Sequence, residues 1–238
     1  MTGTGPASRR VVSLVPSVTE TLLGWGLTPV AVTRFCPAPG VLAVGGTKNP
    51  DIEAIIELDP DLVVMDREEN RAADAQALES AGIAVLATHI TSLTDVQPEL
   101  TRLATALGLP APEPGTLSSP APHSSALRVW VPIWRRPWMA IGGGTYGSSL
   151  LRAAGFHNVC AGQGGRYPCI DPAEVAGVGA DYVLAPSEPY KFTERHRVEL
   201  EVVAPAVFVD GQDLFWWGAR TEAALRRFGD LAMTLATR

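Results

Sequence analysis

The residues that could bind a polar ligand, or perform chemistry on one, are gathered in short segments that each follow a predicted strand. Open α/β sheets bind their ligands at the carboxyl ends of strands, so these segments form the candidate site. In the first half of the chain they are Pro16-Ser17, Arg34-Phe35-Cys36, Gly45-Gly46-Thr47-Lys48 and Asp66-Arg67-Glu68-Glu69-Asn70. In the second half they are Trp134-Arg135-Arg136-Pro137-Trp138, Gly143-Gly144-Thr145-Tyr146, Arg166-Tyr167-Pro168, Ser187-Glu188-Pro189-Tyr190 and Asp213-Leu214-Phe215-Trp216-Trp217.

The two halves differ in the chemistry they offer. Of the 16 aromatic residues, only Trp25 and Phe35 precede residue 110. A surface that stacks on a flat ligand must therefore come mainly from the second half, whereas the first half offers cations and backbone amides. Trp134 and Trp138 bracket two arginines, which favours a place in the wall of a binding site over a place in the core for at least one of them.

Several cations lie in the same segments: Arg34, Lys48, Arg67, Arg135 and Arg166. They favour an anionic or strongly polar ligand, because a charge-assisted hydrogen bond shielded from water contributes about 1.5–3 kcal/mol. Any one of these arginines could instead only balance a nearby acid, and both interpretations stay open at this point.

Short β-branched runs alternate with helical segments along the chain, which is typical of α/β architecture with largely parallel sheets. The predicted strands are residues 11–15, 30–33, 61–65, 83–87, 127–133, 138–141, 181–185 and 206–210. The predicted helices are residues 17–25, 49–58, 71–80, 94–107, 148–154, 172–176 and 220–236.

Three of the predicted helices begin with a local signal. Ser17 and Glu20 have the spacing of a capping box. Asn49-Pro50 is expected to begin the second helix, since proline loses nothing at a first-turn position. In the segment Asp171-Pro172-Ala173-Glu174, aspartate is the expected N-cap and proline the first helical residue.

A change of composition divides the chain. Residues 110–125 read PAPEPGTLSSPAPHSS, with five prolines and five serines or threonines. That is the composition of a linker. We therefore predict an N-terminal lobe of residues 1–108, a Pro/Ser-rich linker of residues 109–126 and a C-terminal lobe of residues 127–238. Each lobe is expected to hold a mostly parallel sheet flanked by helices.

Composition excludes several classes of protein. The chain has 238 residues, is 46% hydrophobic and carries a net charge of −6, which argues against a nucleic-acid partner. Its three cysteines lack metal-motif spacing, although a Cys160–Cys169 disulfide stays open. No apolar stretch approaches the roughly 18 residues of a membrane span, so no membrane insertion is expected. No targeting segment is visible in Met1–Arg10, which taken literally predicts a cytoplasmic protein; a removed leader would make it periplasmic or extracellular.

Other site chemistries are weaker alternatives. Gly142–Gly147 has the formal GxGxxG pattern of a dinucleotide site, but no acidic residue occurs between Gly147 and Asp171 for the ribose. A metal site among Cys36, His89, His157, Cys160 and Cys169 is not expected, because only His157 and Cys160 are close in the sequence. No GxSxG motif suggests a hydrolase. Glu68-Glu69 is expected to be a solvated charge run rather than a pair of catalytic carboxylates.

Three stretches of the chain carry a family resemblance: VVSLVPSVTETLLGWGL, VGGTKNPDIEAIIELDPDLVVMDREEN and ADYVLAPSEPY. They resemble the corresponding stretches of the class III periplasmic binding-protein superfamily, which includes the cobalamin-binding and siderophore-binding components of ABC importers. The resemblance implies two α/β lobes facing across a cleft, a ligand held between them, and no catalysis.

Departures from the family pattern limit what the resemblance implies. The visible sequence shows no leader, and the Pro/Ser-rich segment replaces the family's long connecting helix. Exported members dock on a permease through one glutamate in each lobe. Glu53 matches the first position, but Ala173 occupies the second, with Glu174 one place later. A tryptophan that cobalamin binders place near Thr47 is also absent. We therefore do not expect an ABC permease partner.

These observations favour a non-enzymatic protein that binds a small or medium ligand, with cobalamin, another corrinoid or a chelated metal as candidates and no required cofactor. The alternative is a cytoplasmic enzyme with Arg34, Lys48, Arg67, Glu68 and Glu69 as a polar active site. The expected ligand-binding residues are Ser17, Arg34, Phe35, Thr47, Lys48, Arg67, Glu68, Trp134, Arg135, Trp138, Thr145, Tyr146, Arg166, Tyr167, Glu188, Tyr190, Trp216 and Trp217.

Overall fold

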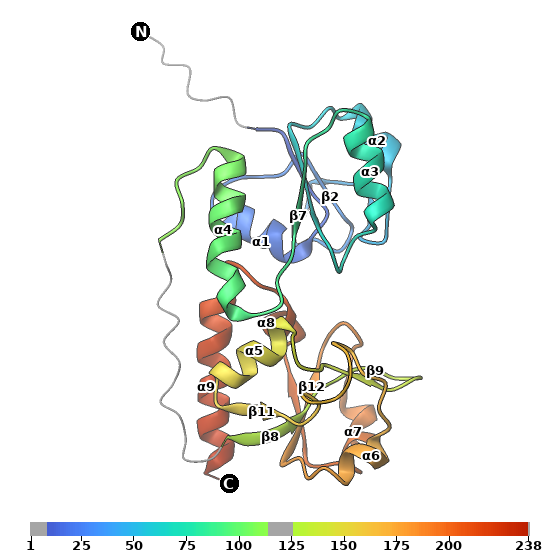
Figure 1. Cartoon of the computed structure of the whole chain (residues 1–238), viewed down its shortest axis with the longest axis vertical. Coiled ribbons are helices and arrows are strands. Elements are labelled where there is room, and N and C mark those ends of the chain that lie inside the picture. Colours follow the sequence, from blue (N-terminus) through green and yellow to red (C-terminus); the bar gives the residue numbers. More distant parts are fainter. Residues whose placement is uncertain (1–8, 114–125, 238) are drawn as a thin grey trace. The chain divides into compact units, whose positions relative to one another are not determined.

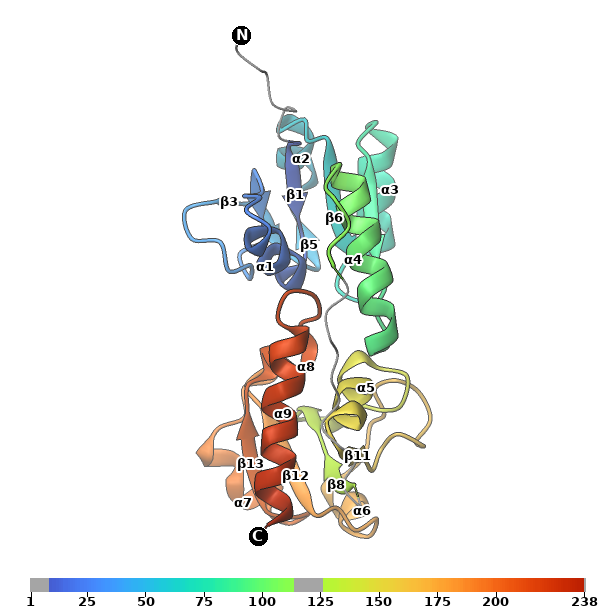
Figure 2. The ribbon, with the colours of Figure 1, turned by 90° about the vertical axis from the view of Figure 1, so that its left-hand side faces the viewer.

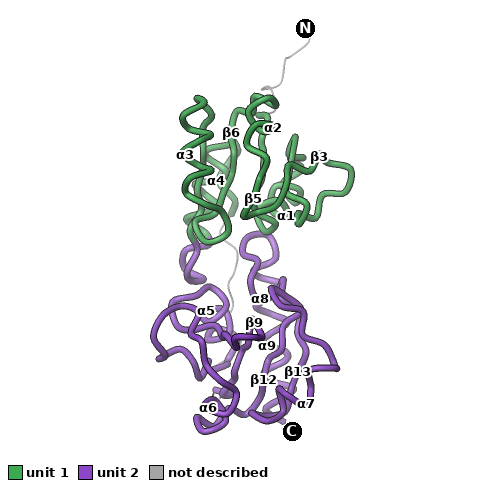
Figure 3. The backbone as a smooth tube through the Cα atoms, turned by 90° about the vertical axis from the view of Figure 1, so that its right-hand side faces the viewer, with its two compact units in different colours: residues 1–89, 97–113 green, residues 90–96, 114–238 purple. Residues whose placement is uncertain are grey.

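A computed structural model describes residues 9–113 and 126–237 of the chain (Figure 1). Most of the predicted linker therefore lies outside the described residues. By its contacts the chain divides into two compact units, of residues 1–89 with 97–113, and of residues 90–96 with 114–238 (Figure 3). Residues 90–96, which the predicted N-terminal lobe included, thus group with the second unit.

Unit 1 is built on a five-stranded parallel sheet with the strand order β3-β2-β1-β6-β7. A short antiparallel hairpin, β4–β5, follows the edge strand β3. The strands are β1 Val11–Ser13, β2 Ala31–Val32, β3 Leu42–Ala43, β4 Gly45–Gly46, β5 Asn49–Pro50, β6 Leu62–Asp66 and β7 Val85–Thr88. The helices are α1 Pro16–Gly24, α2 Ile52–Glu57, α3 Ala72–Ser80 and α4 Leu93–Leu107, whose first residues belong to unit 2.

Helices cover both faces of this sheet, with α1 and α4 on one side and α2 and α3 on the other (Figure 1). Side chains alternate between the two faces of a strand, so a continuous apolar run supplies both faces at once. Val12 and Val63 pack with Ile55 of α2 and Leu78 of α3. Ser13 faces the other way and accepts a hydrogen bond from Thr19 Oγ1 of α1 at 2.8 Å.

Unit 2 repeats this plan with a four-stranded parallel sheet in the order β11-β8-β12-β13. A second antiparallel hairpin, β9–β10, follows β8. The strands are β8 Leu127–Trp130, β9 Pro132–Trp134, β10 Met139–Ala140, β11 Phe156–Asn158, β12 Tyr182–Pro186 and β13 Ala206–Val209. The helices are α5 Tyr146–Ala153, α6 Pro172–Ala176, the 3₁₀ helix η1 Glu194–His196, α7 Arg197–Leu200, α8 Gly211–Phe215 and α9 Thr221–Ala236.

The long helix α9 and the shorter α5 lie on one face of this sheet, and both run in front of it in Figure 2. Helices α6 and α7 cover the opposite face, where Val175 and Leu200 join a core that includes Trp130 and Val183. Both units are therefore helix–sheet–helix layers, as the predicted fold class requires. No helix of the described residues is both long and apolar enough to span a membrane.

Two of the three predicted helix starts are wrong. Helix α1 begins at Pro16 with Val15 as its N-cap and has no side-chain cap, so Ser17 and Glu20 form no capping box. Asn49 and Pro50 form the strand β5, paired with Gly45–Gly46, and helix α2 begins only after Asp51, whose carboxylate accepts the Ala54 N–H. The third start is confirmed, because Asp171 and Glu174 form a reciprocal capping box.

Adjacent residues of α2 provide a matched test of the unit 1 core. Ile55 is fully buried, whereas its neighbour Ile56 is 38% exposed. We predict that Ile55→Ala lowers the free energy of unfolding by about 2–5 kcal/mol, because it leaves a cavity against the sheet. Ile56→Ala should change it by about 0.5 kcal/mol or less. Urea unfolding of both variants checks this, and equal effects would show that α2 does not pack as described.

Candidate functional site

Three polar loops meet at the carboxyl edge of the unit 1 sheet, and one buried amide joins them. Asn70 Nδ2 donates to the Thr47 carbonyl at 2.8 Å and to the Leu14 carbonyl at 3.5 Å. Its Oδ1 accepts the Asp66 backbone N–H at 2.8 Å. Lys48 Nζ in turn donates to the Glu68 carbonyl. The loop after β1, the β4–β5 turn and the loop after β6 are therefore held together by Asn70.

Arg34 and Phe35 extend this group from the end of β2. The Arg34 guanidinium carbon lies 4.8 Å from the centre of the Phe35 ring, which is 56% exposed. A Cβ atom at Gly46 would come within 3.3 Å of Arg34 Nη2 and of the Phe35 ring. Both side chains thus lie over the hairpin turn, and the structure brings together Arg34, Phe35, Thr47, Lys48 and Glu68.

Two other predicted residues of unit 1 have different surroundings. Arg67 is exposed beside Glu68, and its backbone N–H donates to the Thr88 carbonyl at 3.0 Å. Ser17 is 5% exposed within α1, so little of its side chain reaches the surface. Among the predicted site residues of unit 1, the exposed cations are therefore Arg34, Lys48 and Arg67.

Asp66 supports the loop that carries Arg67 and Glu68. One carboxylate oxygen accepts the backbone N–H groups of Glu68 at 2.8 Å and Glu69 at 3.2 Å, and the other accepts the Thr88 hydroxyl at 2.7 Å. Burial raises the pKa of Asp66 above its ordinary value. The supporting roles of Asp66, Asn70 and Thr88 were missed in the sequence, where only the polar character of the loop was visible.

Trp134 and Tyr190 of unit 2 form an edge-on aromatic pair in which Trp134 is exposed and Tyr190 is half-buried. Their ring centres are 5.7 Å apart at 75°, and Trp134 is 44% exposed. Trp138 has a different role, since it stacks on the buried Phe192 at 6.0 Å and contacts Trp130 at 5.6 Å. Of the two tryptophans that bracket the arginines, Trp134 borders solvent and Trp138 packs against the core.

Arg135 lies between those tryptophans and is paired within the protein. Its Nε donates to Glu199 Oε2 at 2.6 Å. This ion pair competes with any ligand anion for the guanidinium. Arg166 and Tyr167 belong instead to an exposed loop whose backbone contacts the glycine segment before α5, where Gly142 N–H donates to the Arg166 carbonyl at 2.7 Å.

The start of α5 holds two predicted site residues that serve the fold. Thr145 is the N-cap and accepts the Ser148 N–H at 3.3 Å. Tyr146 is 6% exposed, its hydroxyl lies 3.0 Å from Thr221 Oγ1, and burial raises its pKa. A Cβ atom at Gly142 would lie 2.4 Å from the Gly165 carbonyl oxygen. Gly142 of the formal GxGxxG pattern therefore leaves space that the protein's own backbone occupies.

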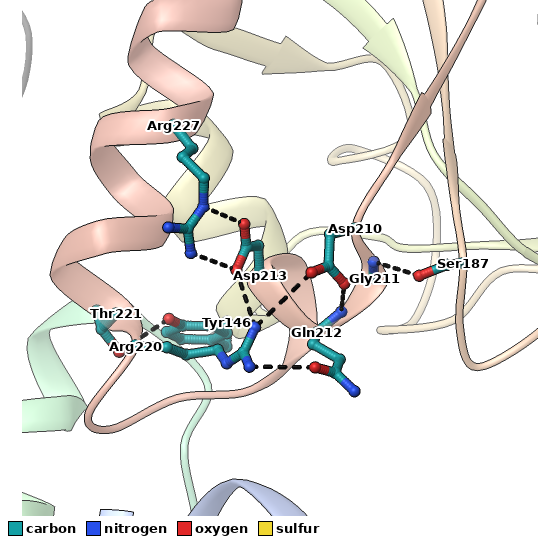
Figure 4. Close-up of polar contacts among 9 residues, drawn as sticks. All are labelled: Tyr146, Ser187, Asp210, Gly211, Gln212, Asp213, Arg220, Thr221 and Arg227. Carbon is teal, nitrogen blue, oxygen red and sulfur yellow. Dashed lines mark hydrogen bonds and ion pairs between the residues drawn. The ribbon is translucent and has the colours of Figure 1, made fainter. Parts of the chain in front are cut away.

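A cluster of charged side chains lies between α8 and α9 (Figure 4). The buried Asp213 carboxylate accepts from Arg220 Nη1 at 2.9 Å and from Arg227 Nη2 at 2.6 Å. Arg220 also donates to Gln212 Oε1 at 3.1 Å, and its guanidinium carbon lies 5.1 Å from the centre of the Trp216 ring. The neighbouring Trp217 is 5% exposed and belongs to the interior.

The carboxyl ends of β12 and β13 are tied to each other in the same region. Ser187 Oγ accepts the Gly211 N–H at 2.9 Å (Figure 4). A Cβ atom at Gly211 would lie 2.5 Å from the Glu188 nitrogen and 2.6 Å from its Cγ, so only glycine fits there. Glu188 is half-buried against this contact.

The two candidate docking glutamates, Glu53 and Glu174, have different surroundings. Glu53 is exposed in the first turn of α2, whereas Glu174 Oε2 accepts the Asp171 N–H at 3.1 Å in the capping box.

All three cysteines are free, so the Cys160–Cys169 disulfide left open above does not form here. Burial raises the pKa of the Cys160 thiol to about 11. Within residues 9–113 and 126–237, no group of three or more His, Cys, Asp or Glu side chains could hold a metal ion.

Comparison with known proteins identifies the kind of molecule that has this fold. Residues 11–112 match a family model described as periplasmic binding protein. The vitamin B12-binding protein of Salmonella typhimurium is 26% identical over 185 residues, covering 71% of this chain and 69% of that protein. Two solved structures that match are the periplasmic vitamin B12 binding protein BtuF of Vibrio cholerae (TM-score 0.76, 18% identity, 97% and 98% of the two chains) and the apo form of the periplasmic heme-binding protein RhuT from Roseiflexus sp. RS-1 (TM-score 0.77, 21% identity, 96% and 98%).

These matches confirm the expected fold class and the expected kind of protein. The relatives and structural neighbours are binding proteins, so the alternative of an enzyme with Arg34, Lys48, Arg67, Glu68 and Glu69 at its active site is not supported. The expectation of a cytoplasmic protein is not supported either, because the family model and both solved structures are described as periplasmic.

Asp66 generates a prediction about stability and pH. The raised pKa means that the folded protein binds this proton more tightly than the unfolded chain, so stability rises as the pH falls through the pKa of folded Asp66 towards the unfolded value. In Asp66→Asn the amide can donate to Thr88 Oγ1, whose hydroxyl then donates to the Met65 carbonyl 3.0 Å away. We expect this variant to be as stable as the wild type at pH 7, or about 1 kcal/mol more stable, and to lack this pH dependence.

Urea unfolding at about pH 5 and pH 7 measures the effect. Asp230→Asn, at an exposed position of α9, serves as the control and should leave the pH dependence unchanged. A loss of more than about 2 kcal/mol in Asp66→Asn at pH 7 would contradict the account, since it would mean that the ionised carboxylate is required.

Proposed function

We propose that this chain is a binding protein of the class III periplasmic binding-protein superfamily, and that it binds a metal-chelating tetrapyrrole, a corrinoid or heme, without transforming it. Vitamin B12 and heme are what the matched proteins are named for. The observation that carries the proposal is the aromatic pair Trp134–Tyr190 at the carboxyl edge of the unit 2 sheet.

This aromatic pair suits a large flat ligand. Aromatic faces contribute about 0.5–1.5 kcal/mol per ring contact beyond the area that they bury. The rings behind Tyr190 are themselves fixed by packing, because the Tyr190 and Phe192 centres are 4.8 Å apart and Phe192 is 3% exposed. The surface is therefore rigid before a ligand arrives, which lowers the entropic cost of binding.

Unit 1 offers a different chemistry, which suits the polar groups of a ligand. Arg34, Lys48 and Arg67 are exposed at its carboxyl edge, and Asn70 and Asp66 hold their loops in place. Cations of this kind bind carboxylates or phosphates through charge-assisted hydrogen bonds. A ligand that carries anionic side groups suits this surface of unit 1.

We do not extend the proposal to a membrane transporter. Glu174 is engaged in its helix cap, so of the two candidate docking glutamates Glu53 alone is exposed without such a contact. The compartment follows the relatives in this proposal: the chain acts where the periplasmic members act, and ligand binding does not depend on that assignment.

A ligand panel tests the proposed function. We predict that cyanocobalamin or hemin quenches tryptophan fluorescence and raises the melting temperature. At 100 times its Kd a ligand stabilises the folded state by about 2.7 kcal/mol, which shifts the melting temperature by roughly 5–10 °C in a chain of this size. A ferric hydroxamate chelate tests the other class of chelated metal. No response to any of the three would refute the proposal while leaving the fold assignment intact.

Trp134 is the residue whose removal should weaken binding most clearly. We predict that Trp134→Ala raises the Kd of whichever panel member binds by about tenfold or more, because the exposed ring supplies contact area to the ligand. Val198→Ala is the control, since Val198 is 83% exposed on α7. Titration calorimetry compares the two, and an unchanged Kd in Trp134→Ala would place the ligand elsewhere.

A further inference from the structure

One buried histidine of unit 2 packs against the aromatic rings that include Tyr190. His196 ends the 3₁₀ helix η1 and is 4% exposed. Its ring centre lies 5.5 Å from that of Tyr190 and 5.6 Å from that of Phe192, with both contacts edge-on. The imidazole is therefore packed among the rings that support Tyr190.

Both nitrogens of this imidazole face N–H donors. The Thr193 backbone N–H points at Nδ1 from 3.0 Å, and the Arg195 Nε–H points at Nε2 from 3.2 Å. The Tyr190 hydroxyl also lies 3.3 Å from Nε2. A neutral imidazole has a lone pair for one such donor, whereas an imidazolium has none. When Nδ1 accepts from Thr193, Nε2 carries the proton, so protonation of His196 would add a second N–H, at Nδ1, directly against the Thr193 N–H.

The nearby cations also disfavour the protonated form of His196. Arg195 lies on the same helix, and Arg135 faces the ring from the β9–β10 turn. Burial of the ring, followed by these two cations, lowers the pKa of His196 below its ordinary value. Glu199 of α7 opposes this shift, but it is paired with Arg135, and Glu194 is paired with Arg197. Tyr190 is the remaining titratable group in contact with the ring.

Tyr190 connects this histidine to the exposed surface. It contacts His196 on one side and Trp134 on the other, and Trp134 has no other ring contact among the described residues. A change at His196 that displaces Tyr190 would therefore also shift the position of the Trp134 side chain.

We propose that His196 is a positioning residue for the ligand surface: in its neutral form it holds Tyr190, and through it Trp134, in the binding arrangement, and its protonation loosens both. Ligand would then be held at neutral pH and released on acidification. The effect on the ligand rests on the proposed function, whereas the coupling of His196 to Tyr190 does not.

The first experiment needs no ligand. Protein carrying ¹³C-labelled histidine and tyrosine is titrated by NMR from about pH 8 to pH 5, the range in which histidine changes charge. We expect His196 to titrate below the ordinary pKa of histidine, and the Tyr190 ring signals to move with the His196 midpoint. His196→Asn and Tyr190→Phe assign the signals. A His196 that titrates at or above the ordinary pKa of histidine, or Tyr190 signals that do not change as His196 is protonated, would overturn the proposal.

The second experiment measures affinity for cyanocobalamin and hemin over the same pH range. A single coupled proton weakens binding by at most about tenfold for each pH unit below the pKa of free His196. In His196→Asn the amide oxygen can still accept the Thr193 N–H, so the helix is kept while the titrating ring is lost. This variant should bind more weakly at pH 8 and lose the acid-induced fall in affinity, whereas His157→Asn keeps the wild-type profile.

The outcomes separate the two proposals. An acid-induced fall that persists in His196→Asn would refute the positioning role even if the ligand binds. If neither probe binds at any pH, the proposed function fails, and the NMR titration alone decides whether His196 controls Tyr190. A melting temperature of His196→Asn close to that of the wild type shows that the comparison is made on folded protein.

Discussion

Parallel strand pairing is the constraint on which the candidate site depends in each unit. β1 pairs in parallel with β2 and β6, and β12 with β8 and β13. Every loop that leaves the carboxyl end of a strand therefore emerges at the same edge as its neighbours. The chain must cross back to the opposite edge before each next parallel strand, so residues far apart in the sequence, such as Arg34 and Arg67, reach one edge without any contact of their own.

The two units stabilise those edges by different means. In unit 1 the loops are polar, and buried hydrogen bonds of Asn70 and Asp66 hold them, each worth about 1 kcal/mol net but expensive to leave unmade. In unit 2 the corresponding support is a set of ring contacts that runs from Trp130 through Trp138 and Phe192 to Tyr190. A rigid apolar surface and a cationic surface thus arise from one architecture, because their supporting residues differ.

Sequence patterns predicted what is local and missed what is not. The alternation of β-branched runs gave the correct fold class, and the Asp171 capping box was correct because all of its partners lie within four residues. Asn49-Pro50 was assigned to a helix because the pairing that makes it a strand, with Gly45–Gly46, depends on a turn that local propensity does not reveal. The Pro/Ser-rich linker and the domain bounds stay predictions, since most of that segment lies outside the described residues.

The same difference between local patterns and long-range contacts applies to the candidate site. Trp134 and Trp138 look equivalent in sequence, but the β9–β10 hairpin leaves one at the surface and packs the other on Phe192, 54 residues along the chain from Trp138. Arg135 was expected to meet a ligand anion, and its partner Glu199 is 64 residues away. Asn70 and His196 carried no motif at all. Their importance follows from what they contact after folding.

In the proposed function, the ligand is held by the aromatic loops of unit 2 that carry Trp134 and Tyr190. Hydrogen–deuterium exchange of the protein with and without cyanocobalamin or hemin tests it most directly. We expect the ligand to slow exchange in residues 134–138 and 187–192 and to leave α6 and the far end of α9 unchanged. Slower exchange confined to α6 and α9, with these loops unaffected, would contradict it.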